Sequence, residues 1–276
     1  MLKSLYVSAF ITACWVGAIW AGVLAAGGLT AAWGEVFALG VPALFFARLF
    51  VAPVARTSAN LWWMPAAGLA GAAFAAWHGG TAQAIASLLI GTGGSLLYIF
   101  WYSRFGAGPA ALAPGERLPD FELIDSAGET VHSKVLAAKP AVWLFFRGNW
   151  CPLCMAQIRE IAAQYRALNE RGVELLLVTP QPEANTRKLA QRFEVPMRFF
   201  TDRDNAAARA LGIVVEGGLP AGLQALGYDS DVPRPTVLIT DAGGRILHSD
   251  LSDNYRVRPE PDAFLHIIDR ELGTPA

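Results

Sequence analysis

The chain has 276 residues, of which 54% are hydrophobic and 16% are charged, against about 25% charged in ordinary globular domains. The charge is uneven, because the first 105 residues carry five charged residues and the remaining 171 carry 40. The two parts have formal charges of +3 and −4, so neither has the basic field that nucleic acid requires. The composition argues against nucleic-acid binding and predicts a membrane part followed by a water-soluble domain.

Residues 1–105 are predicted to form an all-α transmembrane domain. Two long stretches without charge, 4–34 and 57–103, exceed the roughly 20 apolar residues that one helix needs to cross a bilayer. A cleavable signal peptide is the alternative for the first segment, but that segment is long and another apolar segment follows it. We therefore expect four membrane helices, near residues 5–27, 36–55, 60–77 and 82–102.

The few cations in this part predict its orientation. Lys3, Arg48, Arg56 and Arg104 fall at alternate loops, and short loops rich in Lys and Arg stay on the cytoplasmic side. This favours a cytoplasmic soluble domain on a bacterial-type inner membrane. A periplasmic domain is the alternative, since many membrane-tethered redox domains face the oxidising side.

The membrane part offers little chemistry of its own. Cys14 is its only cysteine, so a thiol relay within the membrane is not expected, and Cys14 is interpreted as a packing residue. Small residues four positions apart, such as Gly17 with Ala21 and Gly68 with Ala72, favour close helix packing. They are compatible with a bundle or with contact between copies of the chain.

Residues 106–117 are rich in Gly, Pro and Ala and predict a linker. From residue 118 to 276 the pattern alternates between short apolar runs and amphipathic stretches. Strands are predicted at 141–146, 173–178, 235–240 and 245–248, and helices at 152–168, 183–193 and 261–272. This order predicts an α/β domain with a central mixed sheet and helices on both faces.

A Cys-Pro-Leu-Cys motif lies where the first of these strands leads into a helix. Backbone N–H groups at a helix start stabilise an anion, so we expect the thiol of Cys151 to be unusually acidic. Pro152 suits the first helical turn, and Cys154 lies one turn further, within disulfide reach. The motif predicts that Cys151 attacks and Cys154 resolves. Half of a zinc site and an inert buried pair are the alternatives.

Four segments follow one another at family-like spacing: 118–123 (LPDFEL), 145–154 (FFRGNWCPLC), 200–202 (FTD) and 234–239 (RPTVLI). On these segments the soluble part, from about 116 to 272, resembles the peroxiredoxin-like branch of the thioredoxin superfamily. This branch is the alkyl hydroperoxide reductase and thiol-specific antioxidant group. The membrane part resembles no family that we recognise.

The resemblance implies a role for each residue of the motif. Cys151 takes the place of the peroxidatic cysteine, and Cys154 that of the second cysteine of a redox-active disulfide. Pro235 takes the place of the cis-proline that faces the thiol pair, and Arg234 that of the arginine that holds the thiolate and polarises peroxide. Further support is expected from Arg147, Trp150 and Thr236.

The sequence departs from the family pattern at two places that affect which substrate is expected. Peroxiredoxins carry Thr or Ser three residues before the peroxidatic cysteine, whereas this chain has Gly148. Residues 214–233 form a long Gly-rich insertion that either shapes a substrate surface or packs.

The resulting hypothesis is a membrane-anchored thiol–disulfide oxidoreductase with antioxidant activity. It would reduce hydroperoxides or protein disulfides with electrons from a donor of the thioredoxin or glutathione type. Dithiol exchange needs no bound cofactor or metal, and the lipid bilayer is the expected partner of the helices. Two alternatives are a copper metallochaperone on a thioredoxin fold and a membrane bundle that binds a partner under control of the redox domain.

Overall fold

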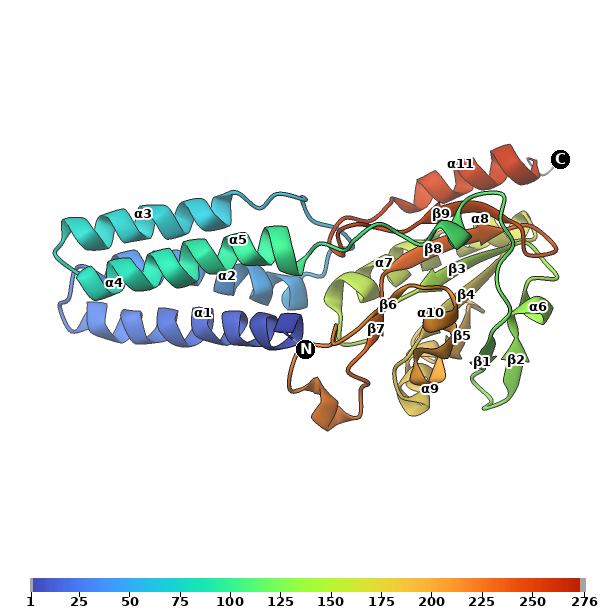
Figure 1. The fold of residues 1–276 in the computed structure, drawn as a ribbon, viewed down its shortest axis with the longest axis horizontal. Coiled ribbons are helices and arrows are strands. Elements are labelled where there is room, and N and C mark those ends of the chain that lie inside the picture. The colour runs from blue at the N-terminus through green and yellow to red at the C-terminus, as the bar shows by residue number, and fades with distance from the viewer. Residues whose placement is uncertain (1, 274–276) are drawn as a thin grey trace. The chain divides into compact units, whose positions relative to one another are not determined.

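The computed structural model describes residues 2–273 and divides the chain into two compact units (Figure 1). The first unit comprises Met1–Pro53 and Thr57–Arg104, and the second comprises Val54–Arg56 and Phe105–Ala276.

The first unit is helical. Its helices are α1 (Leu2–Ala26), α2 (Ala32–Val51), α3 (Trp63–Trp77) and a continuous run, Thr81–Tyr102, made of α4 (Thr81–Ala86), η1 (Ser87–Gly94), α5 (Ser95–Leu97) and η2 (Tyr98–Tyr102). Helix α1, helix α2 and the run Thr81–Tyr102 are long and apolar enough to cross a membrane. Helix α3 has 15 residues, a rise of roughly 22 Å against a hydrocarbon core of about 30 Å. Helices thus occur at all four predicted positions, and three of them have the length of a membrane span.

Glycines allow these helices to approach closely. A Cβ on Gly34 of α2 would lie 2.3 Å from the carbonyl oxygen of Gly71 in α3, and a Cβ on Gly68 would lie 2.5 Å from the backbone nitrogen of Thr92. Such distances are shorter than any van der Waals contact, so only glycine fits. The packing role predicted for Gly68 is confirmed within the first unit.

The second unit is built on a seven-stranded mixed sheet (Figure 1). Its strands are β1 (Glu122–Ile124), β2 (Thr130–His132), β3 (Ala141–Phe145), β4 (Glu174–Thr179), β5 (Arg198–Thr201), β8 (Thr236–Thr240) and β9 (Ile246–Asp250), in the order β2-β1-β5-β4-β3-β8-β9. Strands β3, β4 and β5 are parallel, and the other pairings are antiparallel. A separate two-stranded sheet joins β6 (Val214–Val215) to β7 (Val232–Pro233). The predicted mixed sheet is confirmed.

The helices of this unit follow the strands in alternation. They are α6 (Ser133–Leu136), α7 (Pro152–Ala163), α8 (Tyr165–Glu170), α9 (Glu183–Ala190), α10 (Ala206–Ala210) and α11 (Pro261–Leu272), with short 3-10 turns η3 (Ala110–Leu112), η4 (Arg203–Asn205) and η5 (Leu223–Leu226). The single helix predicted over 152–168 is interrupted at Gln164, whose φ of −90° and ψ of 0° separate α7 from α8.

Strand β3 forms the centre of the core. All five of its residues are buried, and because side chains alternate between the faces of a strand, both faces of the sheet are covered here. Trp143 packs edge-on against Phe121, and its indole N–H donates to Thr240 Oγ1 at 3.0 Å. The central strand therefore holds the loop that follows it, residues 146–151, on a rigid base.

Candidate active site

The sheet register brings the predicted site segments together. Phe145 at the end of β3 pairs with Thr236 at the start of β8. Because β3 and β8 are antiparallel, the loop leaving β3 and the Arg234-Pro235 segment entering β8 lie at the same edge of the sheet. This is the edge at which the parallel strands β3, β4 and β5 end.

Cys151 and Cys154 lie at the start of α7. Cys151 is the residue before the helix, with an extended backbone, and Pro152 is the first helical residue. Both cysteines are free thiols and share a hydrogen bond. Their exposed fractions are 2% for Cys151 and 0% for Cys154, so a substrate reaches Cys151 only after a local opening of the structure.

The surroundings of the pair favour the thiolate of Cys154 over that of Cys151. The hydrogen bond with Cys154 and burial raise the pKa of Cys151 well above its ordinary value, against the opposing effect of Arg258 and Arg147. Burial also disfavours the Cys154 thiolate, but the hydrogen bond from Cys151 and the guanidinium of Arg258 outweigh it and hold the pKa of Cys154 well below its ordinary value. The expectation of an acidic Cys151 is therefore wrong, because the cation lies against Cys154.

Arg258 supplies that cation. Its Nη2 lies 3.4 Å from Cys154 Sγ, its Nη1 donates to Gln157 Oε1 at 2.6 Å, and its Nε donates to the carbonyl oxygen of Tyr255 at 3.1 Å. The sequence reasoning missed Arg258, which follows β9 in the irregular stretch 251–260. That stretch has no periodicity to distinguish a buried arginine from a surface one.

Arg147, just after the end of β3, also acts on the pair, because its charge favours the Cys151 thiolate and lowers the pKa of that thiol against the effect of burial. Its guanidinium packs between two aromatic rings, 4.9 Å from the centre of Trp150 and 5.2 Å from that of Tyr255, and it donates to the carbonyl oxygen of Gly218. The indole nitrogen of Trp150 is buried and has no hydrogen-bond partner in the described chain.

Arg234 and Pro235 differ from what the resemblance implies. Arg234 donates to the backbone carbonyls of Ser252 at 2.8 Å and Gly106 at 2.7 Å, so its guanidinium links two chain segments. The bond before Pro235 is trans, since residues 2–273 contain no cis peptide bond. The trans form is favoured by about 0.5–1 kcal/mol even before proline. Thr236 donates its hydroxyl to the carbonyl of Arg234 at 3.0 Å.

The insertion 214–233 contributes to the same edge of the sheet. Tyr228 donates to Asn149 Oδ1 at 2.5 Å, and the backbone N–H of Asn149 donates to Gln181 Oε1 at 2.8 Å. Gln181 and Tyr228 also line a polar pocket of about 530 Å³, together with Thr201 at the end of β5. The insertion therefore shapes the surface beside the cysteine motif.

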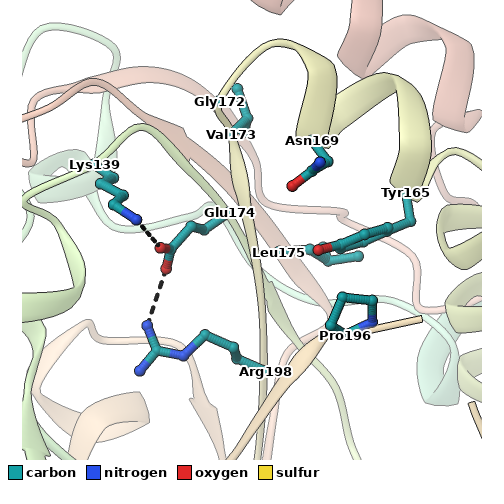
Figure 2. Close-up of a pocket in the computed structure, with 9 residues that line it drawn as sticks. All are labelled: Lys139, Tyr165, Asn169, Gly172, Val173, Glu174, Leu175, Pro196 and Arg198. Carbon is teal, nitrogen blue, oxygen red and sulfur yellow. Dashed lines mark hydrogen bonds and ion pairs between the residues drawn. The ribbon is translucent and has the colours of Figure 1, made fainter. Parts of the chain in front are cut away.

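The opposite edge of the sheet has a smaller pocket, of about 190 Å³ (Figure 2). Glu174 at the start of β4 forms ion pairs with Lys139 at 3.1 Å and with Arg198 at 3.0 Å. Burial disfavours its carboxylate, but these two cations hold the pKa of Glu174 below its ordinary value. Neither here nor elsewhere in the described residues do three or more His, Cys, Asp or Glu side chains gather at a spacing that would hold a metal ion.

Comparison with known proteins identifies the family of the second unit. The AhpC/TSA family matches residues 114–249. The thiol-disulfide oxidoreductase ResA of Halalkalibacterium halodurans is 30% identical over 120 residues, which are 43% of this chain and 67% of that protein. ResA of Geobacillus thermodenitrificans is 27% identical over 146 residues, covering 52% of this chain and 73% of that protein. The chloroplastic peroxiredoxin Q of Triticum aestivum is 24% identical over 102 residues, covering 37% and 47%.

Proposed function

Since the chain belongs to the AhpC/TSA family and is a thiol-dependent oxidoreductase, we propose that it is a membrane-anchored thiol–disulfide oxidoreductase whose redox pair is Cys151 and Cys154. The observation that carries this proposal is the hydrogen-bonded pair of thiols at the start of α7, with a guanidinium against one of them. A thiolate is the reactive form of cysteine, and this arrangement keeps one thiolate within the pair.

The reaction begins with a proton transfer inside the pair. Cys151 passes its proton to the Cys154 thiolate through their shared hydrogen bond, and the Cys151 thiolate attacks one sulfur of the substrate disulfide. The second substrate sulfur leaves as a thiol after taking up a proton. Cys154 then gives its proton to the solvent, and its thiolate attacks Cys151 Sγ in the mixed disulfide. The bond between Cys151 and the first substrate sulfur breaks, the Cys151–Cys154 disulfide forms, and the first substrate sulfur takes up a proton and leaves as a thiol. An external dithiol or glutathione returns the two electrons.

Protein disulfides fit this site better than hydroperoxides. At Gly148 φ is +141°, and a Cβ there would lie 2.7 Å from the indole nitrogen of Trp150. The site therefore has no room for the hydroxyl-bearing residue with which peroxiredoxins hold peroxide. The relatives with the higher identities are named thiol-disulfide oxidoreductases, which supports the same choice.

The helical unit serves as the anchor in this proposal. Three of its helices have the length and composition of membrane spans, and the cations at alternate loops support a cytoplasmic face for residues 118–276. Reaction of intact cells with a membrane-impermeant thiol reagent tests the facing. Labelling of Cys151 from outside would overturn the cytoplasmic assignment.

Turnover by the detergent-solubilised full chain tests the proposed chemistry. With a dithiol as donor, the chain is expected to reduce the disulfides of insulin, and Cys151→Ser is expected to abolish that reduction. Cys14→Ser is the control, because Cys14 lies in α1 and takes no part in the exchange. Unchanged turnover in Cys151→Ser would contradict the proposal, and turnover of hydroperoxide alone would identify a peroxidase instead.

A further inference from the structure

We propose that Arg258, held in place by Gln157, is a positioning residue that keeps Cys154 as the thiolate of the reduced pair and so makes the Cys151–Cys154 disulfide more oxidising. The inference rests on the proposed function and extends it to a residue outside the motif. It also lies outside residues 114–249, to which the family match extends.

The surrounding contacts hold the guanidinium of Arg258 against Cys154 Sγ. Arg258 exposes 5% of its surface and Gln157 exposes 2%, so neither side chain is free to turn into solvent. Gln157 lies one turn after Cys154 on α7, and its Oε1 accepts from Nη1 at 2.6 Å while Nη2 lies 3.4 Å from Cys154 Sγ. The side-chain amide of Gln157 thus orients the guanidinium so that its second nitrogen, Nη2, faces Cys154 Sγ.

Charge balance gives the same conclusion. Across residues 2–273, no carboxylate oxygen lies within 4 Å of Arg258. Arg258 helps to lower the pKa of Asp250, although burial raises that pKa overall, and the anionic groups that act on Arg258 itself are Cys154 and Cys151. By contrast, Arg171 makes two hydrogen bonds to the carboxylate of Asp269, at 2.6 and 2.9 Å. A buried cation without a counter-charge is costly, and the Cys154 thiolate is the anion that lies against Arg258.

This contact acts on the redox equilibrium as well as on the attack. When a donor thiolate attacks Cys151 in the disulfide, the bond to Cys154 breaks and Cys154 leaves as a thiolate beside Arg258. A second attack by the donor's other thiolate on the mixed disulfide releases Cys151, which takes up one proton. The pair gains two electrons and the donor is oxidised to its disulfide. Stabilising the thiolate product favours the reduced pair, which is the property of a stronger oxidant.

The test is the equilibrium of the pair with a glutathione redox buffer at pH 7, measured on the full chain in detergent by alkylation of the reduced thiols. A Cys14→Ala background leaves only the two thiols of interest. Arg258→Gln removes the charge and is expected to shift the equilibrium constant about tenfold toward the disulfide, equivalent to about 30 mV. Arg258→Lys keeps the charge and is expected to lie between Arg258→Gln and the unchanged chain.

Gln157→Glu provides a second variant that does not depend on the fold tolerating a lost arginine. It places a carboxylate on the guanidinium at nearly unchanged volume, so it is expected to shift the equilibrium in the same direction. Arg171→Gln is the matched control, since it removes a guanidinium that is already paired with Asp269, and it is expected to leave the constant unchanged.

The outcomes separate this inference from the function on which it rests. Constants within about twofold of the unchanged chain in both Arg258→Gln and Gln157→Glu would overturn the role of Arg258, while Cys151→Ser would still report on the proposed function. If Arg258→Gln does not fold, the Gln157→Glu constant alone decides. The ultraviolet absorbance of the thiolate gives an independent readout, because it is expected to appear at higher pH in both variants.

Discussion

Positively charged side chains have different partners at the two edges of the central sheet. At the edge where β4 and β5 begin, Lys139 and Arg198 share the carboxylate of Glu174, and all three side chains are partly exposed (Figure 2). At the edge where these strands end, the buried guanidinium of Arg258 lies against Cys154 Sγ instead. Both arrangements compensate charge, but only the second uses an anion that can change its redox state.

The difference indicates where chemistry resides in this domain. A carboxylate keeps its charge across the physiological range, so a pair such as Glu174 with Arg198 contributes to stability and little else. A sulfur loses its charge when it is oxidised to a disulfide, so the cation beside it couples an electrostatic free energy to the redox state. Substitutions at the edge with the cysteines are therefore expected to alter redox activity, whereas substitutions at the opposite edge are expected to alter stability alone, and by less.

After the complete loss of turnover expected in Cys151→Ser, the largest effect is expected from Cys154→Ser. Without the resolving thiol, the mixed disulfide between Cys151 and the substrate cannot be released, and turnover is expected to fall by on the order of 10³-fold. The trapped species is measured as a covalent adduct on a non-reducing gel. A variant that turns over normally and forms no adduct would show that the edge with the cysteines is no more reactive than the other.

A smaller loss is expected from Gly148→Ala. The new methyl group would meet Trp150 at 2.7 Å on a backbone with φ of +141°, which costs about 1–3 kcal/mol. The thermal midpoint and the rate of disulfide reduction should both fall. Gly172→Ala is the control, because its φ is +66° but nothing lies within 4 Å of the added Cβ. It is expected to keep the activity, and an equal loss of activity in both variants would show that contact with Trp150 is irrelevant.

The pH dependence of the midpoint potential sharpens the contrast further. Because the pKa of Cys154 is lowered and that of Cys151 is raised, reduction between the two values takes up two electrons and one proton. The potential should then fall by about 30 mV per pH unit as pH rises, and by about 59 mV per unit below the pKa of Cys154, where two protons are taken up. Arg258 and Arg147 are the charged groups that face the pair. A slope of 59 mV throughout the neutral range would show that no thiolate is held.

The smallest effect is expected from Glu174→Gln at the opposite edge. Partly exposed ion pairs contribute up to about 1 kcal/mol, which corresponds to a thermal midpoint lowered by about 2–4 °C at most. The pKa of Glu174 is lowered in the folded protein, so its stabilisation is present above the unfolded value near 4.3 and is lost as pH falls through the folded value. The redox equilibrium should not change. A shifted redox potential in Glu174→Gln would contradict the statement that only the edge with the cysteines controls the redox equilibrium.

Much of this domain could be predicted from local sequence. The buried run at 141–146 and the helix that starts at Pro152 have strong patterns, and the structure has β3 and α7 at these places. The short strands β1, β2 and β5 could not be predicted from sequence periodicity, because three or four residues do not establish a period of two.

The charges of the site could not be predicted in the same way. Arg234 and Arg258 are both arginines near a proline in irregular chain, and only the tertiary structure decides that the first binds carbonyls and the second binds sulfur. The acidity of the pair depends on that contact, so the order of the two pKa values could not be predicted from the motif.

The contact between Arg258 and Cys154 has a consequence for protein engineering. The region shared with the family ends at residue 249, nine positions before the guanidinium that faces the inner sulfur. A chimera that transplants only residues 114–249 into another scaffold would retain both sulfurs and leave their counter-ion behind. Its electron exchange would then follow the recipient's electrostatics.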